Sequence, residues 1–221
     1  MKTVSFLGLP LLFFLYLIGS VPFQSCEPDD CDDEDECDTC MVVYKPNIYI
    51  YPNEPIELSV KLIFPMGGKI VASIPEYGTG WNVLVDTSGL INNAHSYLFY
   101  ESVQPDIWQS KFGWVIPTNK LESFFRKNMA DYGFNGNEIN DFIEYWIPRL
   151  HDFPLYSIYP QTKTMIDDVI QLDFSKSPEN ILRLFYVIKG HHQLRDRLAA
   201  PAIDPFAREG YFVTEWGVIL K

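Results

Sequence analysis

The chain has no cysteine beyond Cys40 and none of the common catalytic motifs. Because residues 41–221 contain no thiol, the body of the protein needs no disulfide. A papain-like Cys/His pair would have to borrow a cysteine from the N-terminal segment, which is implausible. The motifs G-x-S-x-G, H-E-x-x-H, G-x-x-x-x-G-K-S/T and G-x-G-x-x-G are also absent. The chain therefore lacks the usual sequence signatures of serine hydrolases, zinc peptidases and nucleotide-binding enzymes.

Basic residues are few, and they form no stripe. The chain has 17 Lys and Arg against 29 Asp and Glu. Nine of the acidic residues lie in residues 26–40, so residues 41–221 hold the other 20 against 16 bases. A nucleic-acid partner is therefore not expected, because it would require a basic surface. No cofactor is predicted either.

The first 25 residues have the composition of an export signal. Lys2 precedes an apolar run from Val4 to Ile18, which matches a signal-peptide core of about 7–15 residues. A retained signal anchor would need about 20 apolar residues, and Pro10 and Pro22 weaken the ends of that longer segment. Both interpretations export the rest of the chain. The predicted division is a signal peptide (1–25), an acidic and disordered tether (26–44) and one domain (45–221).

Cys26 is the predicted site of lipidation. Phe23-Gln24-Ser25-Cys26 resembles a bacterial lipobox, although Phe23 and Gln24 depart from its usual pattern. The acidic run after Cys26 resembles the signal that sends some bacterial lipoproteins to the cell surface. The predicted location is therefore the bacterial outer membrane or cell surface, and the alternative is plain secretion.

The other cysteines are predicted to form disulfides, because pairing is the usual state of exported cysteines. If Cys26 carries lipid, one bridge forms among Cys31, Cys37 and Cys40; if it does not, four cysteines form two bridges. Cys37 and Cys40 also have the spacing of a zinc-binding pair, but a structural zinc site normally needs a second pair in a folded frame. No metal site is predicted.

The body has the pattern of an α+β domain. Apolar and polar residues alternate from Ile56 to Phe64, which predicts a strand with one buried face. Helical spacing predicts one helix from Thr118 to Gly133 and a second one capped by Asn137 and ended by Pro148. Further strands are predicted at 47–51, 70–74, 81–85, 96–100, 113–116, 155–159, 169–174, 181–189 and 211–220. The expected fold is a mostly antiparallel β-sandwich or open barrel with a central αα-hairpin.

Four short segments resemble landmarks of an uncharacterised group of exported bacterial proteins and lipoproteins. They are Lys45-Pro46-x-Ile48-Tyr49-x-Tyr51-Pro52, Ser96-Tyr97-Leu98-Phe99-Tyr100-Glu101, Tyr145-Trp146-x-Pro148 and Glu215-Trp216-Gly217. The resemblance covers residue 45 to the end. It implies export and a shared domain, and it supplies no catalytic residue.

Three glutamates beside aromatic residues are weak catalytic candidates: Glu101, Glu144 and Glu215. Two carboxylates flanked by aromatic rings are what a glycosidase needs, although most such glutamates are solvated or ion-paired.

Seven aromatic residues form either a binding face or ordinary core: Tyr49, Tyr51, Tyr97, Phe99, Trp108, Trp114 and Trp216. The predicted function is a non-enzymatic role at the cell envelope: either binding a glycan or a protein, or forming a structural part of an envelope assembly. The alternative is a carboxylate-based hydrolase that acts on polysaccharide.

Overall fold

The computed structural model describes residues 40–193 and 197–221. The predicted signal peptide, the lipidation site Cys26 and the disulfide candidates Cys31 and Cys37 lie outside the described residues. The first strand begins at Cys40, so residues 40–44 belong to the sheet and not to the tether to which they were assigned. The folded unit therefore begins several residues before the predicted boundary.

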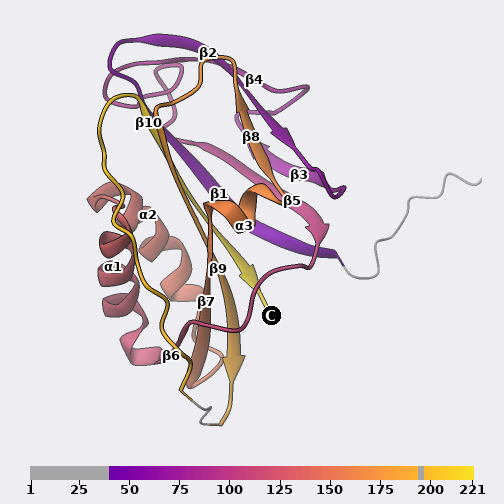
Figure 1. Ribbon diagram of the computed structural model, residues 1–221, viewed down its shortest axis with the longest axis vertical. Coiled ribbons are helices and arrows are strands. Elements are labelled where there is room, and N and C mark those ends of the chain that lie inside the picture. The colour runs from indigo at the N-terminus through magenta and orange to yellow at the C-terminus, as the bar shows by residue number, and fades with distance from the viewer. Residues whose placement is uncertain (1–39, 194–196) are drawn as a thin grey trace, which may run out of the picture. The chain divides into compact units, whose positions relative to one another are not determined.

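The domain is a mixed α+β fold with two sheets, and neither sheet closes into a barrel within the described ranges (Figure 1). The larger sheet has the strand order β3-β5-β1-β10-β9-β7-β6, and the smaller one has the order β4-β2-β8. Neighbouring strands are antiparallel except for β9 and β10, which are parallel. The strands are β1 (Cys40–Tyr51), β2 (Ile56–Ile63), β3 (Lys69–Ile74), β4 (Trp81–Val85), β5 (Leu98–Pro105), β6 (Trp114–Pro117), β7 (Leu155–Thr162), β8 (Gln171–Phe174), β9 (Asn180–His191) and β10 (Phe212–Leu220).

The helices are α1 (Leu121–Tyr132), α2 (Gly136–Trp146) and α3 (Lys163–Asp167), with 3-10 turns at Thr118–Lys120 and Ile147–Arg149. Helices α1 and α2 cover one face of the larger sheet (Figure 1). They bury Phe125, Phe142 and Trp146 against Tyr186 and Trp216 of the sheet. This apolar cluster fixes α2 beside strands β1 and β10.

The smaller sheet shares an apolar cluster with the larger one. Its residues Val60 and Trp81 share a second apolar cluster with Ile48 of the larger sheet. Strand β10 contributes to both clusters, with Val213 on the small-sheet side and Trp216 on the helix side. Successive side chains of a strand point to opposite faces, so one central strand supports both layers.

Each of the ten predicted strands is present in the described ranges, with shifted ends. The predicted face of β2 is confirmed, because Leu58, Val60 and Leu62 are buried while Glu57 and Lys61 are exposed. Helix α3 was not predicted.

The predicted cap of α2 is wrong by two residues. Asn135, not Asn137, is the N-cap: its side chain accepts hydrogen bonds from the backbone N–H groups of Asn137 and Glu138, at 3.1 and 3.2 Å. The Glu138 carboxylate in turn accepts from the Asn135 N–H at 2.7 Å, which completes a capping box. The Asn-x-x-Glu spacing selects Asn135, because only there does a carboxylate stand three residues later.

Candidate functional site

A bulge in β1 places Lys45 at the surface of the larger sheet. The pairing of β1 shifts register between Tyr44 and Asn47 against β10, and between Val43 and Asn47 against β5. Within this bulge Lys45 has a left-handed backbone with φ of 51°. That conformation is unusual for lysine, and the residue before a proline normally prefers an extended backbone. Bulges of this kind redirect side chains and are common beside functional sites.

The Lys45 ammonium lies among three aromatic rings. Its Nζ is 4.8 Å from the ring centre of Tyr145, 5.1 Å from that of Phe99 and 5.2 Å from that of Tyr97. These distances allow cation–π attraction to each ring. Burial lowers the pKa of Lys45, and the more distant carboxylates of Asp141 and Glu101 partly oppose that shift. The guanidinium of Arg149 also lies over the Tyr145 ring, 3.8 Å from its centre.

These aromatic residues line a cavity of about 320 Å³, called the aromatic cavity below. Helix α2 supplies Tyr145, β5 supplies Phe99, and the loop before β5 supplies Tyr97. The full lining is Lys45, Ile74, Ala94, His95, Ser96, Tyr97, Phe99 and Tyr145. Aromatic rings, one ammonium and the hydroxyl groups of Ser96, Tyr97 and Tyr145 therefore meet in a single hollow.

A second hollow of about 560 Å³, called the polar cavity, adjoins the first. The two cavities share Ser96, and the rings of Tyr49 and Tyr97, one from each cavity, are 5.3 Å apart. The lining of the polar cavity is Tyr49, Tyr51, Ser88, Gly89, Leu90, Ser96, Asn135, Asn137, Asn140, Asp141 and Glu144. Together the cavities form a two-part cleft between α2, strand β1 and the 86–97 loop.

A hydrogen-bond chain holds the wall between the two cavities. Tyr49 Oη donates to Asp141 Oδ2 at 2.8 Å, and the buried Asn47 Nδ2 lies 3.4 Å from the same Tyr49 oxygen as a weak donor. Burial, and then the charge of Asp141, raise the pKa of Tyr49, so its phenol stays protonated and keeps donating. The hydrogen bond from Tyr49 of β1 thus fixes the position of Asp141 in the cleft.

Three of the four sequence landmarks meet at this cleft. The first contributes Lys45, Tyr49 and Tyr51, the second contributes Ser96, Tyr97 and Phe99, and the third contributes Tyr145. The fourth landmark lies beneath it. A side chain at Gly217 would come within 3.2 Å of Pro46 Cγ and 3.0 Å of the Phe185 ring, so glycine there lets the bulged segment pack closely.

The three candidate glutamates do not share one site. Glu215 is fully buried on the small-sheet side, where it accepts from Tyr100 Oη at 2.8 Å and pairs with Arg183 Nε at 2.5 Å. Glu144 lies on the opposite face of the larger sheet and lines the polar cavity. Glu101 is half-buried on β5. Both oxygens of Glu215 are engaged inside the protein, so its surroundings are those of a structural ion pair.

The predicted aromatic set divides between core and cleft. Trp108 and Trp216 are core residues, and Trp114 packs on Phe124 of α1. The remaining four, Tyr49, Tyr51, Tyr97 and Phe99, line the cleft. Sequence reasoning missed Lys45, Asn140, Asp141 and Tyr145 as site residues. The landmark segments contain Lys45 and Tyr145, and the i, i+3 spacing of Asp141 and Glu144 on the polar side of α2 was an available signal.

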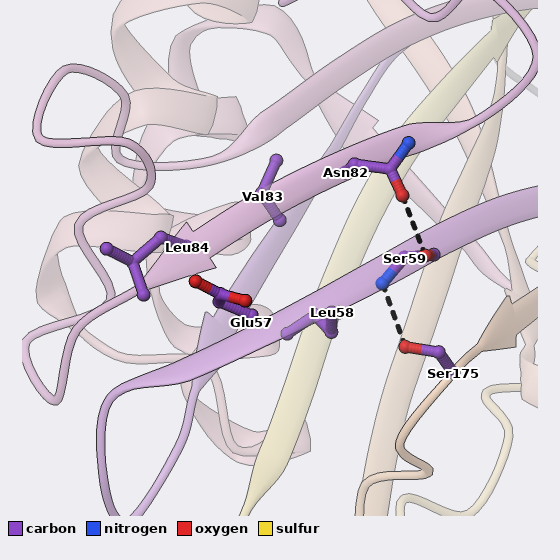
Figure 2. Close-up of a pocket in the computed structure, with 7 residues that line it drawn as sticks. All are labelled: Glu57, Leu58, Ser59, Asn82, Val83, Leu84 and Ser175. Carbon is purple, nitrogen blue, oxygen red and sulfur yellow. Dashed lines mark hydrogen bonds between the residues drawn. The ribbon is translucent and has the colours of Figure 1, made fainter.

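A third hollow, of about 380 Å³, lies on the outer face of the smaller sheet (Figure 2). Its polar groups bond mainly to one another. Ser59 Oγ donates to Asn82 Oδ1 at 2.8 Å, and the Ser59 N–H donates to Ser175 Oγ at 2.9 Å. Because these groups are already paired and no aromatic ring lines the hollow, it is a weaker candidate than the two-part cleft.

No protein-family model, curated protein or solved structure matches the chain. Among the described residues, no group of three or more His, Cys, Asp or Glu side chains could hold a metal ion. No helix in the same part of the chain is long and apolar enough to cross a membrane.

Proposed function

We propose that the protein is exported and lipid-anchored at the cell envelope, and that its domain binds a glycan in the two-part cleft. The observation that carries the proposal is the junction of an aromatic cavity with a polar one. Sugar rings have apolar faces that pack on aromatic rings, and their hydroxyl groups bond to amides, hydroxyls and carboxylates. Tyr97, Phe99 and Tyr145 provide the rings, while Asn140 and Asp141 provide polar partners beside them.

In this proposal the fold is a rigid support for the residues of the cleft. We take the two sheets as a β-sandwich and α1–α2 as an αα-hairpin laid on its larger sheet, as expected from the sequence. In that arrangement the buried apolar face of α2 fixes Asp141, Glu144 and Tyr145 relative to β1. A rigid cleft loses little conformational entropy when it binds its ligand.

The binding prediction uses the full mature chain and a panel of oligosaccharides, with affinities measured by calorimetry. At least one oligosaccharide should bind, and Tyr145→Ala should weaken it about tenfold, because a ring contact contributes about 0.5–1.5 kcal/mol beyond its area and tenfold corresponds to about 1.4 kcal/mol. Asn140→Ala should also weaken binding. Asn82→Ala is the matched control, because Asn82 is an exposed asparagine in the hollow on the other sheet. Failure of every oligosaccharide to bind, with the chain folded, would reject the proposal.

The hydrolase alternative is favoured by one observation: Asp141 and Glu144 line the same cavity one helical turn apart. The same panel tests it through the release of reducing ends. Turnover by the unmodified protein that disappears in Glu144→Gln would replace the binding role with hydrolysis. Intact oligosaccharides after long incubation would leave the binding role in place.

The lipid anchor is tested separately. When the full chain is expressed in a bacterium fed with labelled fatty acid, the unmodified protein should carry the label and Cys26→Ser should not. The reason is that the lipid is attached to the cysteine that follows the predicted signal. Absence of label from both proteins would contradict the anchor and favour plain secretion.

A further inference from the structure

The Lys45 ammonium uses none of its hydrogen-bond donors within the described part of the chain. In residues 40–193 and 197–221 it has no hydrogen-bond acceptor and no carboxylate within 4.0 Å, although it lines the aromatic cavity. Arg149 likewise has no carboxylate partner there, and its guanidinium donates only to the Tyr145 backbone carbonyl, at 2.6 Å. Two cations therefore border one aromatic ring without an opposing charge in contact.

This arrangement costs the folded protein free energy. Partial burial of a charged amine without a hydrogen-bonded partner in the protein is unfavourable, and the lowered pKa of Lys45 reflects that cost. The left-handed backbone of a non-glycine residue adds strain. The three ring contacts offset part of the cost, but they engage the faces of the rings and leave the N–H donors of the ammonium unused. Strain and unpaired charge that gather in a cavity are typical of binding sites.

The charges of the two cavities have opposite signs. The aromatic cavity holds Lys45, with Arg149 beside it, whereas the polar cavity holds Asp141 and Glu144. A carboxylate on the ligand is attracted to the first cavity and repelled by the second. Neutral hydroxyl groups, in contrast, can bond to the carboxylates and amides of the polar cavity. The cleft thus distinguishes the two ends of an elongated ligand.

We infer that the ligand is an oligosaccharide with one acidic unit, whose carboxylate pairs with Lys45 in the aromatic cavity while neutral units occupy the polar cavity. This inference rests on the proposed glycan-binding function and narrows it to sugars that end in a uronic acid. Lys45 makes the direct charge-assisted hydrogen bond, and Arg149, whose guanidinium also lies over the Tyr145 ring, adds a second positive charge nearby.

The test uses matched pairs of short glucan, xylan, mannan and chitin oligosaccharides, each with and without a terminal glucuronic acid, and the methyl ester of each acid. Calorimetry on the full mature chain should show the acidic form of at least one pair binding about tenfold or more tightly than its neutral and esterified forms. The preference for the acidic form should decrease as the salt concentration rises, because it depends on attraction between charges.

Lys45→Met should remove most of the preference for the acid, and Lys45→Arg should restore part of it. Lys61→Met is the matched control, because Lys61 is exposed on the other sheet. If Lys45→Met does not fold, Arg149→Met and the salt dependence still decide the question. Equal affinity for acidic, neutral and esterified forms would overturn the inference and leave glycan binding intact. Absence of binding to every member of the panel would reject the glycan-binding function itself, and the inference with it.

Discussion

Replacing Arg183 by methionine should lower the free energy of unfolding by about 3–5 kcal/mol, because the change leaves the buried carboxylate of Glu215 without its counter-charge. Both side chains are almost inaccessible to solvent. Arg183 also donates from Nη1 to Asp167 Oδ1 at 2.7 Å and to the Ile170 carbonyl. One guanidinium therefore ties β9 to β10, to α3 and to the segment that leads into β8.

Urea denaturation of the whole protein measures this effect. Arg126→Met is the matched control, since Arg126 forms an exposed i, i+4 pair with Glu122 that contributes only about 0.3–0.5 kcal/mol. The double variant Arg183→Met with Glu215→Gln should recover part of the lost stability, because it removes the unpaired charge. A loss below about 1 kcal/mol for Arg183→Met would contradict the structural role assigned to this ion pair.

Glu215 also illustrates a contact that could not be predicted from the sequence. The sequence indicated that residues 211–220 form a strand, and β10 confirms it. It could not indicate that β10 runs parallel to β9, the pairing that brings Glu215 beside Arg183. Arg183 and Glu215 are 32 residues apart, so no local sequence pattern predicts their contact. From the sequence alone, a buried structural glutamate therefore could not be distinguished from a catalytic one.

The candidate site was only partly predictable for the same reason. Strand alternation, helix spacing and the glycine after α1 are local, and they located nearly every element. The cleft depends on a bulge at Lys45 and on α2 lying across β1, and both follow from tertiary packing. The landmark segments contain seven of the eighteen residues that line the cleft, including all of its Tyr and Phe side chains, but nothing in their spacing indicated that they meet.

The sequence pattern and the structure agree most closely in β2, which leads to the second large effect. Leu62→Ala should lower the free energy of unfolding by about 2–5 kcal/mol, whereas Lys61→Ala should change it by no more than about 0.5 kcal/mol. Leu62 is 8% exposed and packs in the apolar cluster to which both sheets contribute, while Lys61 is exposed. Truncation of leucine loses buried apolar contacts and leaves a cavity that the surrounding sheets fill only in part.

Denaturant midpoints of the two variants give the comparison, because the two substitutions stand next to each other on one strand and differ in the face they alter. The hydrogen bond to Tyr77 Oη, at 2.7 Å, is donated by the backbone N–H of residue 62, which alanine retains, so the difference reports the Leu62 side chain alone. Both variants should keep the same denaturant dependence, because neither changes the surface exposed on unfolding by much. Similar shifts for the two would mean that β2 buries the other face. The smaller sheet would then pack on the larger one through Glu57, Ser59 and Lys61, which offer few apolar atoms with which to hold two layers together.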